Sequence, residues 1–142
     1  MFFLKELPTL QMIEGYGEHF PAHGAQQVLS KLTFLREASL LQRRLDTYFS
    51  EHGFSQLRFL ALVVIDREIE RDELSHGEIT ERLDVSKPVV TRTLNSLTDE
   101  GLLRVSRREQ DGRTKVFELT QQGRKKLAHV FPGYFAILHA DG

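Results

Sequence analysis

The stretch "SKPVVTRTLNSLTDEGLLRVSRREQDGRTKVFELTQQG", residues 86–123, decides the fold of this chain. Its first half predicts a helix. Ser86 is a good N-cap residue, and Pro88 falls in the first turn, where its missing N–H costs little. Gly101 is a typical residue to end the helix. The buried face is predicted from apolar residues at helical spacing: Val90, Leu94 and Leu97.

The second half of this stretch predicts a two-stranded β-hairpin. The segment "RREQDGRT" contains the turn dipeptide formed by Asp111 and Gly112. On both sides of it, apolar residues alternate with polar ones, which is the period of a strand: Leu103, Val105, Phe117 and Leu119.

The segment "SHGEITERLDV", residues 75–85, predicts another short helix just before. Ser75 and Glu78 have the spacing of a capping box. Only Asp84 and Val85 separate the two predicted helices, so they must cross at a steep angle, as in a helix-turn-helix. A helix-turn-helix followed directly by a hairpin is the winged-helix arrangement.

Longer helices flank this unit. Residues 25–51 carry apolar residues at three- and four-residue spacings and predict a long amphipathic helix that ends near Gly53. Residues 55–71 begin at the cap-like Ser55 and are apolar enough for the centre of the core. A last helix begins after Thr120 and is kinked or ended near the Pro-Gly pair at 132 and 133. The predicted fold class is α+β, mostly α.

The charge of the chain is unevenly distributed. The formal net charge is −1, but residues 75–126 hold 11 Lys and Arg against 8 Asp and Glu, a net of +3. A basic segment that coincides with a winged helix points to nucleic acid, although inert solvated surfaces also reach this charge.

Several classes of function are disfavoured by composition. With no cysteine, the chain has no disulfide and no thiolate zinc site. The six histidines form no tight pair such as H-x3-H within a helix, and "HGE" at residues 76–78 lacks the cysteines of a zinc deaminase. No catalytic or nucleotide-binding motif is present. No window is long and apolar enough to cross a bilayer. We therefore expect a soluble, cytoplasmic chain that is not an enzyme, with no metal, cofactor or membrane partner.

The segment 86–123 resembles the MarR family of winged helix-turn-helix transcription regulators. The resemblance rests on the recognition helix, the Gly-Leu pair that leads into the wing, the Asp-x-Arg wing tip and the Leu-Thr-x-x-Gly sequence that closes it. It extends from about residue 25 to 135. It implies a single domain over 1–142, divided into an N-terminal extension (1–24), dimerisation helices (25–54 and 120–142) and a winged-helix lobe (55–119).

The resemblance also implies a homodimer that binds a pseudo-palindromic site in double-stranded DNA and represses or activates transcription. The many aromatic residues are interpreted as core or dimer surface, or as the lining of a pocket for a small-molecule effector. Two alternatives stay open: a winged-helix protein-interaction module without DNA binding, and a sensor regulator of the ArsR type.

The candidate DNA contacts on the recognition helix point away from its apolar stripe. Arg92 can donate two parallel hydrogen bonds to guanine and matches the base-reading arginine of the family, whereas the alternative is a surface ion pair with Asp99. Pro88 and Val89 suit thymine methyl groups, and Ser86 and Thr91 suit phosphate oxygens. The predicted set on this helix is Ser86, Lys87, Pro88, Val89, Thr91, Arg92 and Asn95.

The wing supplies the remaining candidates. Arg113 at its tip suits an adjoining minor groove, where A·T-rich segments concentrate negative potential. Asp111 is expected to accept hydrogen bonds across the turn or to orient Arg113. Arg107, Arg108 and Lys115 would contact the DNA backbone, or would only be solvated charges on an ordinary surface hairpin.

Overall fold

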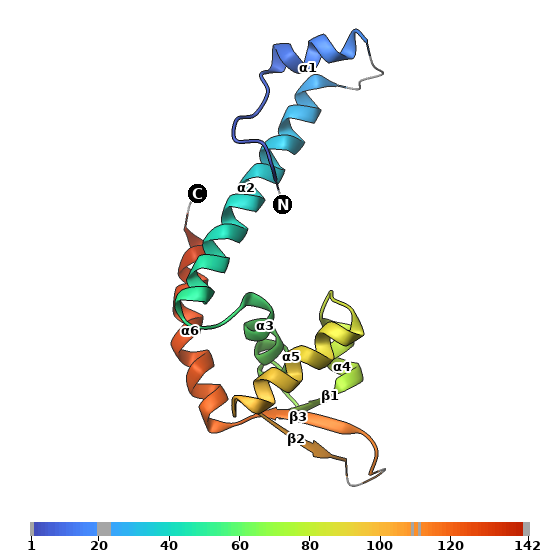
Figure 1. Ribbon diagram of the computed structural model, residues 1–142, viewed down its shortest axis with the longest axis vertical. Helices are drawn as coiled ribbons and strands as arrows, with labels where there is room; N and C mark the ends of the chain where they lie inside the picture. Colours follow the sequence, from blue (N-terminus) through green and yellow to red (C-terminus); the bar gives the residue numbers. More distant parts are fainter. Residues whose placement is uncertain (1, 20–23, 109, 111, 141–142) are drawn as a thin grey trace. The chain divides into compact units, whose positions relative to one another are not determined.

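The computed structural model describes residues 2–19, 24–108, 110 and 112–140. The chain forms two compact units, Met1–Leu45 and Asp46–Gly142. The fold is mostly helical with one small antiparallel sheet, as predicted (Figure 1). None of the described helices combines the length and the apolar character that crossing a membrane requires.

The N-terminal unit is helical. Helix α1 (Leu10–Gly17) begins at Thr9, whose Oγ1 accepts a hydrogen bond from the Met12 backbone N–H at 3.2 Å. No sequence pattern had predicted this helix. Helix α2 (Ala25–Glu51) has the bounds that its apolar periodicity predicted, and its last turn belongs to the second unit. It is followed by a turn at Gly53, whose φ of +61° is a backbone conformation that favours glycine.

The core of the second unit forms around helix α3 (Gln56–Asp66). Ser55 is its N-cap, as predicted, and accepts a hydrogen bond from the Arg58 N–H. The helix ends before residue 71, the predicted limit, because the segment after Asp66 is charged and gains no apolar packing: Ile69 is 98% exposed. The buried side chains of α3 are Phe59, Ala61, Leu62, Val64 and Ile65.

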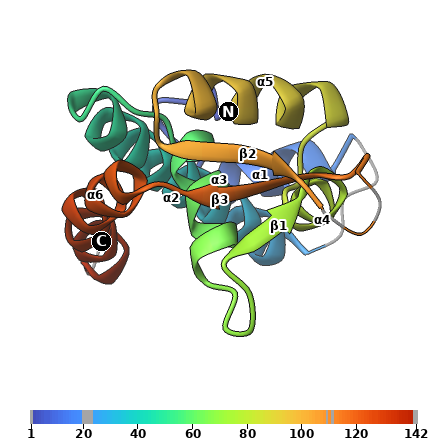
Figure 2. The ribbon, with the colours of Figure 1, turned by 90° about the horizontal axis from the view of Figure 1, so that it is seen from below.

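The sheet has three strands, one more than predicted. Strands β2 (Leu103–Arg107) and β3 (Lys115–Leu119) form the wing, and β1 (Glu73–Ser75) pairs antiparallel with the other edge of β3 (Figure 2). The predicted alternation fails at two positions. Val105 is exposed because β2 extends beyond the core after Leu103, and Val116 is buried because β3 is the central strand.

The helix-turn-helix is formed by α4 (His76–Arg82) and α5 (Lys87–Asp99). The predicted capping box is present: the Ser75 Oγ accepts from the Glu78 N–H at 3.1 Å, and the Glu78 carboxylate accepts from the Ser75 N–H at 3.0 Å. Residues 83–86 separate the helices, two more than predicted, because α4 ends at Arg82. Ser86 is the N-cap of α5 by position, but its side chain makes no capping hydrogen bond.

Helix α6 (Gln121–His139) follows the wing and begins at Thr120, the predicted N-cap. The sequence predicted that this helix is kinked or ends near the Pro-Gly pair at 132 and 133. It continues through Pro132, so it does not end there. Tyr48 from the last turn of α2 donates a hydrogen bond to the Val130 carbonyl at 2.7 Å. Aromatic rings of α2, α3 and α6 pack around this contact, among them Phe49, Phe59 and Tyr134.

Candidate nucleic-acid interface

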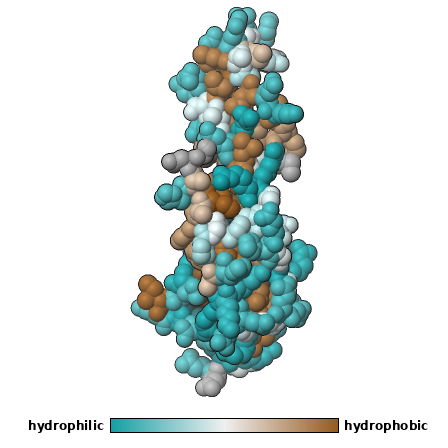
Figure 3. All heavy atoms as spheres, turned by 90° about the vertical axis from the view of Figure 1, so that its left-hand side faces the viewer, coloured by the Kyte–Doolittle hydropathy of each residue, from teal (hydrophilic) through white to brown (hydrophobic). Residues whose placement is uncertain are grey.

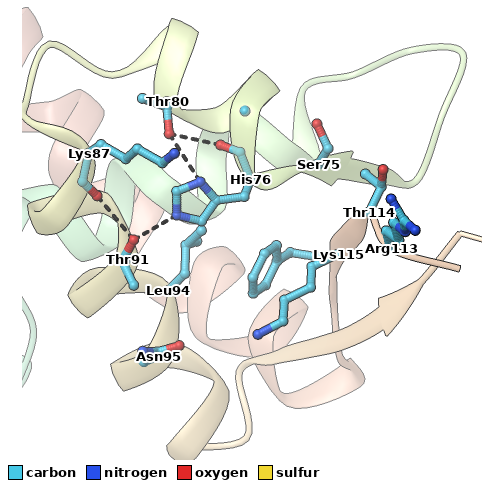
Figure 4. A pocket seen from close by; sticks show the side chains of 12 residues that line it. Ser75, His76, Thr80, Lys87, Thr91, Leu94, Asn95, Arg113, Thr114 and Lys115 are labelled. Carbon is cyan, nitrogen blue, oxygen red and sulfur yellow. Dashed lines mark hydrogen bonds between the residues drawn. The ribbon is translucent and has the colours of Figure 1, made fainter. Parts of the chain in front are cut away.

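A cleft of about 720 Å³ lies between the recognition helix α5 and the wing (Figure 4). Helix α4 forms its floor near the capping box, and the residues that lead into β3 form the opposite wall. Cations from two sides line this cleft, and no Asp or Glu is among the described residues that line it. The polar and charged lining residues are Ser75, His76, Thr80, Lys87, Thr91, Asn95, Arg113, Thr114 and Lys115.

The structure separates the two faces of α5 in the way that its apolar stripe predicted. Val90, Leu94 and Leu97 are fully buried against the lobe. Val89 is half-buried, so only part of its side chain is available to a partner. The other candidate residues of this helix and its N-cap are exposed: Ser86, Lys87, Pro88, Thr91, Arg92 and Asn95.

Arg92 is the candidate base-reading residue. Its side chain is exposed on α5, and within the described part of the chain it forms no ion pair, with Asp99 or with any other acid. The guanidinium therefore has its donors available to a partner. Because a planar guanidinium donates in a fixed fork, this exposure is what a bidentate contact to a base edge requires.

His76 was not identified by sequence reasoning, although the structure places it at the centre of the cleft. Its Nε2 lies 2.8 Å from the Thr91 Oγ1, and its Nδ1 lies 3.4 Å from the Thr80 Oγ1 (Figure 4). Burial lowers the pKa of the imidazole below its usual value, and the positive charges of Lys87 and Lys115 lower it further. The only sequence signal was a histidine directly after a capping serine, which by itself indicates no function.

The wing tip is held by a tight turn. The Gly112 N–H donates to the Arg108 carbonyl at 2.8 Å, and Gly112 has a φ of +63°. The Arg107 guanidinium donates to the Arg113 carbonyl at 3.2 Å, while the Arg113 side chain is exposed. Lys115, at the start of β3, is also exposed. The candidate residue Asp111 lies outside the described residues.

Arg108 and Arg107, which are neighbours in sequence, have different environments. The Arg108 guanidinium is half-buried and donates to the Glu78 Oε1 at 3.1 Å, and the same carboxylate also binds Arg71. The hydrogen bond from Arg71 and that from the Ser75 N–H hold the pKa of Glu78 at about 2. Arg108, the first residue after β2, therefore ties the outer end of the wing to α4, whereas Arg107 is exposed.

Within the described ranges there is no group of three or more His, Asp or Glu side chains that could hold a metal ion.

Comparisons with known proteins agree with this geometry. Residues 52–114 match the model described as "MarR family". The HTH-type transcriptional repressor YetL of Bacillus subtilis is 26% identical over 137 residues, which cover 96% of this chain and 81% of that protein.

Two solved structures show the same architecture. AbsC, a MarR family transcriptional regulator from Streptomyces coelicolor, superposes with a TM-score of 0.73 at 20% identity, over 82% of this chain and 78% of that one. The M. tuberculosis transcriptional regulator MosR, solved in complex with DNA, has a TM-score of 0.61 at 28% identity, over 75% of this chain and 74% of that one.

Proposed function

We propose that the chain is a DNA-binding transcription regulator of the MarR family, because residues 52–114 match the model of that family. It acts as a homodimer on a pseudo-palindromic site in duplex DNA. Repression is the expected sign of regulation, since the similar YetL protein is a transcriptional repressor.

The observation that carries this proposal is the charge of the cleft between α5 and the wing. Lys87 enters it from α5, and Arg113 and Lys115 enter it from the wing, while the described lining contains no carboxylate. A polyanion is the ligand for which such a surface is suited, because each phosphate neutralised releases bound counterions. The exposed Arg92 adds the means to read a base beside it.

In the proposed complex, α5 enters the major groove and the wing reaches the adjoining minor groove. Arg92 donates to a guanine, and Pro88 and the exposed part of Val89 contact thymine methyl groups. Arg113 lies in the minor groove. The phosphate contacts are made by Ser86, Lys87, Thr91, Asn95, Arg107 and Lys115.

Selection from a pool of random-sequence duplexes would test the proposal. The wild-type protein should enrich a two-fold related sequence whose half-sites lie about one helical turn, roughly 10 base pairs, apart. The double variant Arg92→Ala, Arg113→Ala is the matched control and should enrich no defined sequence. If the wild-type protein enriches no sequence and shows no salt-dependent binding to duplex DNA, the chain is a protein-interaction module instead.

A further inference from the structure

We propose that His76 is a further residue of the DNA-binding surface: it positions the recognition helix through Thr91 and takes up a proton when a DNA phosphate occupies the cleft between α5 and the wing. This inference rests on the proposed function and names a proton as an additional ligand of the same site. His76 acts through Thr91 as a positioning residue, because both of its ring nitrogens already face hydroxyl groups.

Each of the two threonine hydroxyls beside His76 also lies within hydrogen-bond distance of a backbone carbonyl. The Thr80 Oγ1 donates to the His76 carbonyl at 2.8 Å, and the Thr91 Oγ1 donates to the Lys87 carbonyl at 3.1 Å. A hydroxyl has a single proton to donate, so a hydroxyl that donates to its carbonyl offers only lone pairs to the imidazole. A neutral imidazole donates from one nitrogen, whereas the imidazolium donates from both. The protonated ring is thus the form that completes both hydrogen bonds.

The charges around the ring oppose that protonated form in the free protein. Lys87 on α5 and Lys115 on β3 line the same cleft as His76, and Arg113 lies at its mouth. Glu78, an acid on the same helix as His76, already forms ion pairs with Arg71 and Arg108. Burial and the two lysines lower the pKa of His76. The neutral form of the ring, in which one of its two hydrogen bonds lacks a proton, is therefore favoured in the free protein.

A phosphate in the cleft reverses this balance. Its negative charge offsets Lys87 and Lys115, which removes part of the repulsion that disfavours the imidazolium. By linkage, a ligand that raises the pKa of His76 binds more tightly when the histidine is already protonated. The protonated ring then makes a stronger, charge-assisted hydrogen bond to Thr91. This hydrogen bond holds α5 to α4, the helix that begins at His76.

The sign of the effect follows. Below the pKa of the free protein, which is below 6.5, His76 is protonated with or without DNA, so affinity is highest and independent of this group. Between the pKa of the free protein and the higher pKa of the complex, binding takes up a proton and affinity falls as pH rises. The limit is about tenfold per subunit per pH unit.

Measuring affinity against pH, at constant ionic strength, tests this directly. The probe is a duplex that the wild-type protein selects from a random-sequence pool. His76→Gln is the informative variant, because the glutamine amide can still donate to the Thr91 hydroxyl but cannot carry a proton. It should still bind, with affinity that no longer falls as pH rises through the range in which the wild-type affinity falls. His19→Gln, an exposed histidine of the other compact unit, is the control and should keep the wild-type profile.

A titration of the His76 ring by NMR, with and without the selected duplex, gives a second readout. The pKa should be below 6.5 in the free protein and should rise on binding. An unchanged ring pKa, or identical pH profiles for the wild type and His76→Gln, would overturn this inference and leave the proposed function intact. If the wild-type protein selects no duplex, the proposed function fails and this inference fails with it.

Discussion

At the scale of single residues, Arg92 is expected to set sequence preference. Its guanidinium is exposed and has no ion pair within the described part of the chain. Arg92→Ala should weaken binding by about 1 to 3 kcal/mol and flatten preference at one base pair of each half-site. Competition assays with duplexes substituted at each position would measure both effects. A uniform loss over all sequences would mean that Arg92 contacts only phosphate.

Arg113 at the wing tip should behave differently. Arg113→Ala should weaken binding to every duplex and lower the salt slope by about one charge per subunit, with loss of preference only for A·T-rich flanks. Arg104→Ala is the matched control, because Arg104 is on strand β2 of the same hairpin, away from the tip, and pairs with Glu118 at 2.7 Å. A salt titration and a thermal melt of both variants separate the cases: a lower melting temperature for Arg113→Ala with unchanged affinity would make the tip structural.

The sequence correctly predicted residues whose role depends on local spacing. The capping box of Ser75 and Glu78 was predicted from a three-residue interval and is present. The ion pair of Arg108 with Glu78, 30 residues apart, could not be predicted, because the sheet and not the local sequence brings them together. His76 was missed for the same reason, since its partner Thr91 belongs to the next helix.

At the scale of elements, Glu78 joins three segments: the loop before β1 through Arg71, the start of α4 through Ser75, and the wing through Arg108. Glu78→Gln should lower the free energy of unfolding by about 1 to 2 kcal/mol at neutral pH, a value discounted for partial exposure. It should also weaken DNA binding, because the outer end of the wing at Arg108 is less firmly held.

The pH dependence of that difference has a defined sign. The pKa of Glu78 is lowered from 4.5 to about 2, so its ionised form stabilises the fold above pH 4.5, and this contribution is lost as pH falls towards 2. Denaturation curves of the wild type and Glu78→Gln should therefore converge over this range. Glu81→Gln, exposed on the same helix, is the control. A constant difference at all pH values would show that the carboxylate charge is not involved.

The junction between the wing and α6 depends on close backbone contact. A Cβ at Gly123 would collide with the Leu102 carbonyl oxygen, which is backbone and cannot turn away. Gly123→Ala should therefore destabilise the protein by about 1 to 3 kcal/mol in urea unfolding. Gly77→Ala is the matched control, since its Cβ would meet only the Ser75 Oγ at 4.0 Å. Equal stability of the two variants would contradict the packing described.

The elements themselves were predictable wherever their pattern was long. Helix α2 has 27 residues and its bounds were predicted from apolar periodicity and Gly53. Strand β1 has only three residues and overlaps the N-cap of α4, so it offers no period of two to detect, and it exists because β3 has a free edge. Burial at Val105 and Val116 likewise depends on which strand is central.

At the scale of the whole molecule, the assembly is the least predictable property, since no local pattern defines it. Each compact unit keeps large apolar side chains at its surface. In the N-terminal unit Phe34 is 65% and Leu35 is 52% exposed, and Figure 3 shows apolar side chains at the surface of this unit, in the upper part of the view. On α6, Phe135 and Leu138 are exposed three residues apart, on one face of the helix.

A homodimer would cover such side chains and would explain them. A single winged helix also contacts too few base pairs for useful specificity, so a two-fold axis should place two recognition helices roughly 34 to 36 Å apart. We therefore expect light scattering at micromolar concentration to give twice the chain mass of 16.4 kDa. A measured mass equal to that of a single chain would contradict this prediction.

Leu138→Glu should shift the monomer–dimer equilibrium towards the monomer, because a carboxylate buried in the interface without a partner is costly. The Leu138 side chain is 43% exposed in the single chain, so the fold of the monomer should lose little stability. Ile69→Glu is the matched control: it changes an even more exposed apolar residue, but one outside the helices proposed for the dimer. Leu138→Glu should lower both the measured mass and the affinity for a two-half-site duplex, while affinity for a single half-site stays near that of the wild type. If both variants remain dimeric and bind alike, the face of α6 that carries Leu138 is not part of the interface, and the dimer must form through other surfaces.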